Sequence, residues 1–218
     1  MTERALRTAT GEIEQARRDC LAATDDARLL GGIAIERTVE QMLNGWPEPA
    51  PAPEVIRKIA ESLAVEAAGQ IAGRLKSLAQ HLQTALRAAA EALHDEEPVS
   101  DGHLEQCVRG MPRFDMALPD APVSPPWFTA FKPVARAAAA RKLNRAAGGA
   151  LQAGFVNHAR ALELWCRKAL QETQQRFEER ADTYRAQLGR LISARPPSEE
   201  DRERAGQQLA ELERWPEG

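Results

Sequence analysis

The chain has 218 residues and a formal net charge of −3, with 43% hydrophobic and only 5% aromatic residues. Alanine, the best helix former, is its commonest residue, whereas the β-branched and aromatic residues that favour strands are scarce. The composition therefore predicts an all-α protein and excludes a β-sandwich, a barrel and a Rossmann-type domain. The weakly acidic balance also argues against nucleic-acid binding, which is typical of strongly basic domains.

The cysteines and the N-terminal segment bear on the compartment. Cys20, Cys107 and Cys166 are an odd number and lie far apart, which argues against a disulfide framework and fits a reducing compartment. The N-terminal segment lacks the apolar core of a signal peptide, and no run of residues is apolar enough over about 18 positions to span a membrane. We therefore expect a cytoplasmic protein.

The first predicted helix covers residues 2–43. Its small and apolar residues alternate steps of three and four positions from Leu6 to Ala34, which is typical of a narrow heptad seam that a coiled-coil partner helix can approach closely. The phase changes after Gly31 and Gly32, where we expect a bend or a change of the buried face. A stiff proline-rich connector at 47–53 follows.

The second predicted helix covers residues 54–94. Its leucine-rich stripe, from Ile56 to Leu93, has a hendecad-like spacing that leaves a helix nearly straight. A short helix at 100–109, with Ser100 as its N-cap, comes next. Residues 110–126 are rich in proline but contain several apolar side chains, so we expect an ordered loop that covers the end of the helices.

The third predicted helix covers residues 133–194, with an ordinary α-helical period from Leu151 to Leu191. The glycines at positions 148, 149 and 154 weaken its first third, where we expect a kink. An acidic helix at 196–218 follows. Long helices joined by short turns bury their stripes by pairing antiparallel. We therefore predict one elongated antiparallel bundle of three long helices plus short ones over residues 1–195, with the proline-rich loop at one tip.

Motifs for catalysis are missing from this sequence. Neither glycine pair has the lysine and preceding strand of a phosphate loop. His94, His103 and Cys107 fall in one short stretch, but a zinc site needs three or four ligands and a fourth is not evident. Paired carboxylates lack the Glu-x-x-His pattern of a di-iron bundle. We expect no catalytic residue, no cofactor and no metal site.

Charge is uneven along the chain. Residues 133–192 hold 11 basic and 5 acidic residues, whereas residues 196–217 hold 3 basic and 7 acidic ones. The basic cluster consists of Lys132, Arg136, Arg141, Lys142 and Arg145. These cations could pair with the acidic segment, face an anionic partner or a phospholipid surface, or form an ordinary solvated face.

Three aromatic residues, Trp127, Phe128 and Phe131, precede the basic cluster. We place them at a tip of the bundle. An aromatic and basic tip could insert at a membrane interface. Alternatively, the aromatic side chains plug the end of the bundle beneath the proline-rich loop.

Residues 112–192 show a recognisable order of features. A proline-rich apolar loop, an aromatic residue and a proline-started basic helix (132–145) come before a spaced series: Asn157, Arg160, Leu162, Trp165, Leu170 and Phe177. This order resembles the C-terminal helical region of bacterial dynamin-like proteins. The preceding long helices, residues 2–94, are similar in kind but carry no diagnostic residues.

The resemblance implies a helical stalk that transmits GTP-driven motion, self-associates and remodels membranes. The phosphate loop and switch regions of the GTPase head are missing from this sequence, so no catalytic residue can be assigned by the resemblance. It implies a stalk fragment, a truncated relative or a separately encoded partner of a GTPase.

Two functional hypotheses follow. The first is a non-catalytic stalk or interaction module that self-associates or contacts a helical protein, a GTPase or, peripherally, a membrane. The alternative is a soluble helical scaffold or regulatory protein with no GTPase link, which binds a partner helix along the seam of residues 6–34.

Overall fold

The computed structural model describes residues 2–44, 52–93, 102–117 and 132–194, and all regular structure within these ranges is helical. The prediction of an all-α protein is confirmed. The elements are α1 (Thr2–Arg28), α2 (Leu30–Asn44), α3 (Ala52–Leu93), α4 (His103–Arg109), α5 (Lys132–Leu143), η1 (Asn144–Gly148) and α6 (Gly149–Ala194). None of the described helices is long and apolar enough to cross a membrane.

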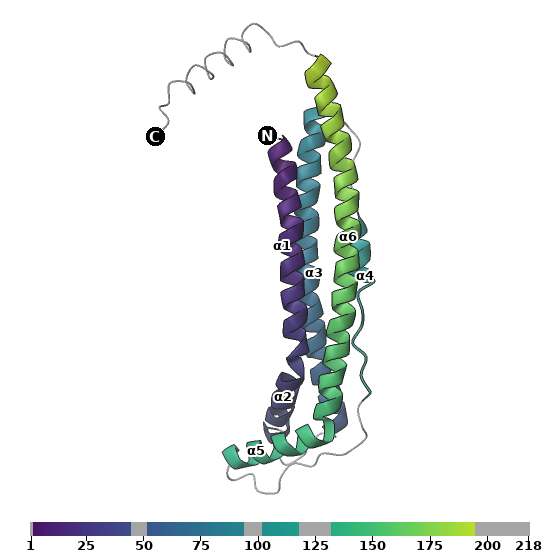
Figure 1. Cartoon of the computed structure of the whole chain (residues 1–218). Coiled ribbons are helices and arrows are strands. Elements are labelled where there is room, and N and C mark those ends of the chain that lie inside the picture. Colours follow the sequence, from purple (N-terminus) through teal and green to yellow (C-terminus); the bar gives the residue numbers. More distant parts are fainter. Residues whose placement is uncertain (1, 45–51, 94–101, 118–131, 195–218) are drawn as a thin grey trace, which may run out of the picture.

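Helices α1, α3 and α6 lie side by side along the molecule (Figure 1). Helix α1 runs antiparallel to both of the others, so α3 and α6 run parallel to each other. Helices joined only by short turns would alternate in direction along the chain. The three long helices do not alternate, because residues 94–131 separate α3 from α5 in the sequence. The pairs that fix these directions are Arg185–Glu3 and Arg28–Glu163 between α6 and α1, and His81–Glu12 and Arg74–Asp19 between α3 and α1.

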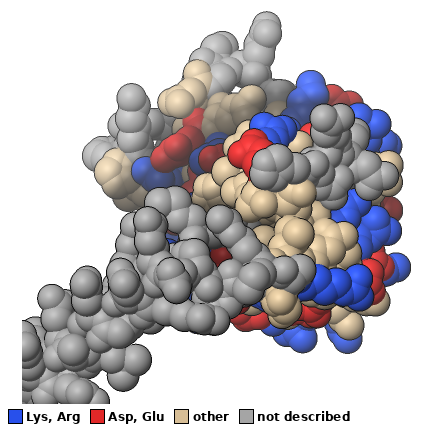
Figure 2. Space-filling view, turned by 90° about the horizontal axis from the view of Figure 1, so that it is seen from above, with Lys and Arg blue, Asp and Glu red and all other residues tan. Residues whose placement is uncertain are grey.

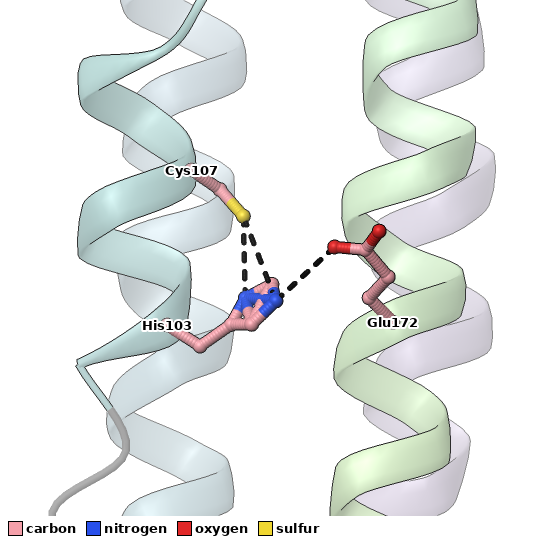
Figure 3. Close-up of side chains that lie close together, drawn as sticks. All are labelled: His103, Cys107 and Glu172. Carbon is pink, nitrogen blue, oxygen red and sulfur yellow. Dashed lines mark hydrogen bonds and ion pairs between the residues drawn. The ribbon is translucent and has the colours of Figure 1, made fainter.

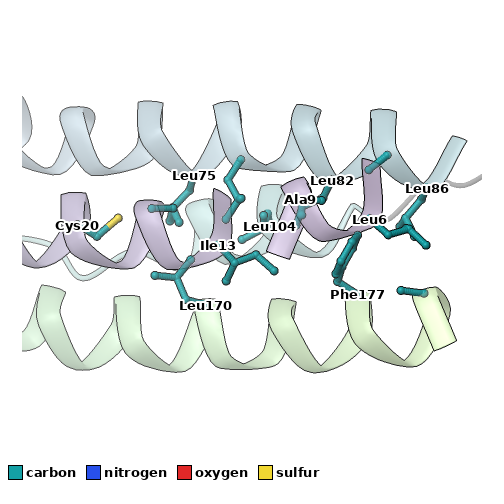
Figure 4. Close-up of a cluster of buried hydrophobic side chains, with 14 of the residues drawn as sticks. Leu6, Ala9, Ile13, Cys20, Leu75, Leu82, Leu86, Leu104, Leu170 and Phe177 are labelled. Atoms are coloured by element: carbon teal, nitrogen blue, oxygen red, sulfur yellow. The ribbon is translucent and has the colours of Figure 1, made fainter. Parts of the chain in front are cut away.

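The apolar stripes of the three helices meet in a common core (Figure 4). Leu6 and Ile13 of α1 are buried against the leucines of α3, and Phe177 of α6 belongs to the same cluster. Burying one such side chain stabilises a fold by roughly 1.5–3 kcal/mol. The small residues of α1 let the helices approach closely, so the heptad seam is covered by α3 and α6 of the same chain.

A second core cluster lies at the other end of the bundle. There α2, the start of α3, α5 and the start of α6 converge. Its largest members are Met42, Ile56, Leu63, Leu143, Leu151 and Phe155.

The first long helix is divided, but not at the glycine pair. The interruption between α1 and α2 falls at Leu29, whose side chain is 69% exposed and whose N–H donates to the Asp26 carbonyl at 3.0 Å. Gly31 and Gly32 instead lie within α2. The predicted change of face is present, because Val39 and Met42 of α2 are buried in the second cluster.

The third long helix is not one straight rod. Helix α5 lies crosswise to α6 at the lower end of the molecule (Figure 1). Between them Asn144–Gly148 form one turn of π-helix, a local widening that commonly accompanies a kink. Gly148 is packed on the side chain of Asn144, where an added Cβ would come within 2.1 Å of Oδ1. The period of the apolar residues did not reveal this bend, but the kink expected from the glycines at positions 148, 149 and 154 falls at this turn.

Other predicted boundaries also shift. Helix α3 begins at Ala52, within the expected connector, and α4 begins at His103. Residues 110–117 run along the flank of α6 (Figure 1). The N-cap of α4 is Gly102, so the expected N-cap at Ser100 is wrong. The connector at 47–51, the rest of the loop (118–126) and the acidic helix at 196–218 lie outside the described residues.

Candidate functional site

Helix α5 is held across the end of the bundle by one apolar edge. Ala135, Ala139 and Leu143, spaced by four residues, are buried, and the latter two pack in the second core cluster with Val39 and Met42 of α2. Alanine at these positions allows α5 to lie close to its support. Ala138 and Ala140 are half-buried, and the other residues of α5 from Pro133 to Lys142 are exposed.

The predicted basic cluster follows this solvent-facing surface. Arg136, Arg141, Lys142 and Arg145 are all exposed. They differ in their contacts, since Arg136 Nη2 donates to Glu40 Oε1 of α2 at 2.8 Å and Arg141 Nε donates to its own helix at the Ala137 carbonyl. Lys132 is the first residue of α5.

No acidic residue occurs between positions 133 and 162 of the sequence. Arg136 is paired with Glu40, and Arg141, Lys142 and Arg145 add further exposed positive charge at the same end of the molecule. By contrast, the opposite end of the molecule shows Lys and Arg interspersed with Asp and Glu on its visible helices (Figure 2). Trp127, Phe128 and Phe131 lie outside the described residues, so their place at a tip stays a prediction.

The described part of the proline-rich loop packs on α6. The rings of Phe114 and Phe155 have centroids 4.9 Å apart, and Phe114 meets the His158 ring edge-on at 5.3 Å. Met116 occupies the space over Gly154, where an added Cβ would lie 2.9 Å from its sulfur. A larger residue at position 154 would force the Met116 side chain to shift. The loop thus covers the side of the bundle over residues 110–117.

Two buried regions carry polar groups. Neither ring nitrogen of His158 has a hydrogen-bond partner among the described residues, and burial lowers the pKa of this imidazole.

Cys20 and Cys166 are buried neighbours, and the hydrogen bond between their thiols, with burial, raises the pKa of Cys166. A raised thiol pKa disfavours the nucleophilic thiolate, which agrees with the place of Cys166 in the buried core cluster.

A cluster of three polar side chains was not predicted from the sequence. His103 and Cys107 lie one turn apart on α4, and Glu172 of α6 faces them (Figure 3). Glu172 comes 69 positions after His103 and belongs to no motif, so only the packing of α4 on α6 identifies it. A cavity of about 530 Å³ adjoins this cluster, lined among others by Gln83, His103 and Phe177.

The comparisons with known proteins return nothing that bears on these sites. No family model matches the chain, and no curated protein or solved structure is significantly similar to it.

Proposed function

We propose that this chain is a non-catalytic helical stalk or interaction module whose basic α5 end contacts an anionic surface. The observation that carries the proposal is the placement of α5 across one end of the bundle, with Arg141, Lys142 and Arg145 directed to solvent and no nearby acid in the sequence. Basic residues near an anionic membrane each contribute about 1 kcal/mol to binding.

The arrangement of the helices supports the stalk part of this proposal. Helix α6 has 46 residues and therefore extends about 69 Å at 1.5 Å per residue. A bundle of this length, with a different surface at each end, is suited to hold two partners apart. The dynamin-like relationship, and with it a GTPase in the same reading frame or as a separate partner, is part of the proposal and rests on the residues between 112 and 192.

Vesicle sedimentation tests the contact surface. The variant R141E/K142E/R145E leaves the Arg136–Glu40 pair intact, and the matched control R87E/R180E/R190E reverses three exposed cations distant from α5. We expect the wild-type protein and the control to sediment with phosphatidylserine vesicles. The α5 variant should bind on the order of 100-fold more weakly, since three contributions of about 1 kcal/mol are lost.

Equal binding by the two variants would contradict a specific role for α5, and failure of the wild-type protein to bind would contradict membrane contact. Circular dichroism spectra of the three proteins establish that all are folded.

The second candidate is a helical scaffold with no GTPase link. The seam of residues 6–34 is covered by α3 and α6, so a partner helix would have to bind elsewhere on this structure. Exposed apolar side chains on three different helices offer contacts, namely Leu29 beside α2, Val65 of α3 and Leu164 of α6, which are 61–70% exposed. Light scattering after size-exclusion chromatography gives the molar mass, which distinguishes a self-associated protein from a monomer that binds a different protein.

A further inference from the structure

We propose that His103, Cys107 and Glu172 form a binding site for a zinc-like transition-metal ion that fastens α4 to α6. This site is independent of the basic end of the molecule and of the stalk proposal. One imidazole, one thiol and one carboxylate converge on the same point, each offering one ligand atom, and these atoms all lie within 4.8 Å of one another (Figure 3).

The sequence of α4 sets up the convergence. Leu104 is buried in the core cluster between α3 and α6, and Val108, four residues later, packs against the same cluster. His103 and Cys107 have the same four-residue spacing, so they lie together on the neighbouring edge of the helix. With Leu104 and Val108 directed to the core, this edge faces Glu172 on α6.

The distances fit a tetrahedral ion. Bonds of about 2.3 Å to sulfur and about 2.0–2.2 Å to nitrogen or oxygen give ligand-to-ligand edges of about 3.3–3.6 Å. Nε2 of His103 is 3.2 Å from Oε2 of Glu172 and 3.9 Å from Sγ of Cys107. All three ligand atoms lie within 4.8 Å of one another, so closing them around an ion requires side-chain movements of up to about 1 Å.

The kinds of donor atom select the kind of metal. Thiolate and imidazole suit zinc and related ions, whereas magnesium and calcium prefer a set made wholly of oxygen atoms. The other Glu172 oxygen, Oε1, is 3.9 Å from Nζ of Lys168, so one oxygen contacts a cation and the other faces His103. The Glu172 side chain is 44% exposed, so the site is open to solvent on that side and a water molecule can serve as the fourth ligand.

Metal binding would have a structural consequence. Helix α4 has only seven residues, and it leads directly into the segment that places Phe114 against Phe155. An ion held by both α4 and α6 would fix this segment to the bundle. Because Cys107 and His103 must give up protons to bind a metal, affinity is expected to fall as the pH is lowered.

The test uses full-length, tag-free protein that has been stripped with a chelator. Cobalt titration followed by optical absorption reports a thiolate ligand through sulfur-to-cobalt charge transfer, and competition with zinc gives the zinc affinity. The variants are C107S, H103A and E172Q. The matched control is E105Q, which changes an exposed carboxylate on α4 outside the three-residue cluster.

We expect the wild-type protein and E105Q to bind one ion per chain and to gain thermal stability with zinc. C107S should lose the charge-transfer band. Loss of an outer-shell group typically lowers metal affinity 10–100-fold, so H103A and C107S, which lose direct ligands, should lower it more than about 100-fold. E172Q should also weaken binding, since an amide is a poorer ligand than a carboxylate.

Two results would overturn the proposal. One is that the wild-type protein binds cobalt no more tightly than C107S does, while both proteins have the same helical circular dichroism spectrum. The other is alkylation of Cys107 that is fast at neutral pH, depends on His103 and is unaffected by zinc. That result would instead assign the 3.2 Å contact between Cys107 Sγ and His103 Nδ1 to an activated thiol.

Discussion

A single buried polar side chain, that of His158, lowers the stability of this fold because it is desolvated. His158 is 5% exposed, lies edge-on to Phe114, and has no hydrogen-bond partner for either ring nitrogen among the described residues. Desolvation disfavours the imidazolium, so the pKa of His158 in the folded protein lies below its ordinary value of 6.5. The unfolded chain therefore binds a proton at this position more readily than the native protein.

This linkage predicts a loss of stability in mild acid. As the pH falls from about 6.5 towards the lower folded-state pKa of His158, the unfolded state gains protons first, so the free energy of unfolding decreases. H158F, or H158L if the larger ring does not fit, should flatten this dependence. Urea denaturation at about pH 7.5 and about pH 5.5 measures it. The exposed-histidine variant H81Q is the control, and an unchanged slope in H158F would contradict the assignment.

The packing of α2 on α6 depends on a close approach of the two helices at Gly31. At the start of α2, an added Cβ on Gly31 would lie 2.7 Å from Oε1 and 3.3 Å from Cα of Gln152 on α6. Gln152 also donates through Nε2 to the Arg28 carbonyl at 3.2 Å, at the end of α1. The neighbouring Gly32 has no atom within 4 Å of such a Cβ. Of the two adjacent glycines, Gly31 alone is required by packing.

The two glycines should therefore respond differently to the same substitution. G32A should raise the free energy of unfolding by roughly 1 kcal/mol, because alanine is the better helix former. G31A should not raise the free energy of unfolding in this way, because Gln152 must move and its hydrogen bond to the Arg28 carbonyl is disturbed. G31L should lower the free energy of unfolding by roughly 1–3 kcal/mol through overpacking. Urea denaturation gives all three values, and equal effects of G31A and G32A would be inconsistent with the close approach.

The whole molecule is long for its mass. Three of its helices lie side by side along one axis, and α5 alone lies across it (Figure 1). A compact domain of 218 residues has a radius of gyration of about 17 Å. Helix α6, with 46 residues, already extends about 69 Å.

Small-angle X-ray scattering should therefore give a radius of gyration well above about 17 Å and a maximum dimension of at least about 70 Å. A dilution series separates this elongation from self-association, because only an oligomer loses scattering mass on dilution. A monomer with the radius of gyration of a compact sphere would disprove the arrangement.

Much of this architecture could be predicted from the spacing of apolar residues. The stripe from Ile56 to Leu93 is buried or half-buried along the whole of α3, because a regular helix brings such residues to one face whatever its surroundings. The interruption at Leu29 and the π-helical turn at Asn144–Gly148 carry no such periodic signal. They arise where α2 and α5 must turn to bury their own apolar edges in the second core cluster.

Helix propensity and periodicity are local properties, so the order of residues was enough to predict a helical protein and the apolar face of each long helix. Three features came instead from packing: the seam of α1 is covered by its own chain, α5 lies across the end, and Glu172 meets His103 and Cys107. These outcomes depend on contacts between residues far apart in the chain, and local spacing carries no information about which distant elements will pack together.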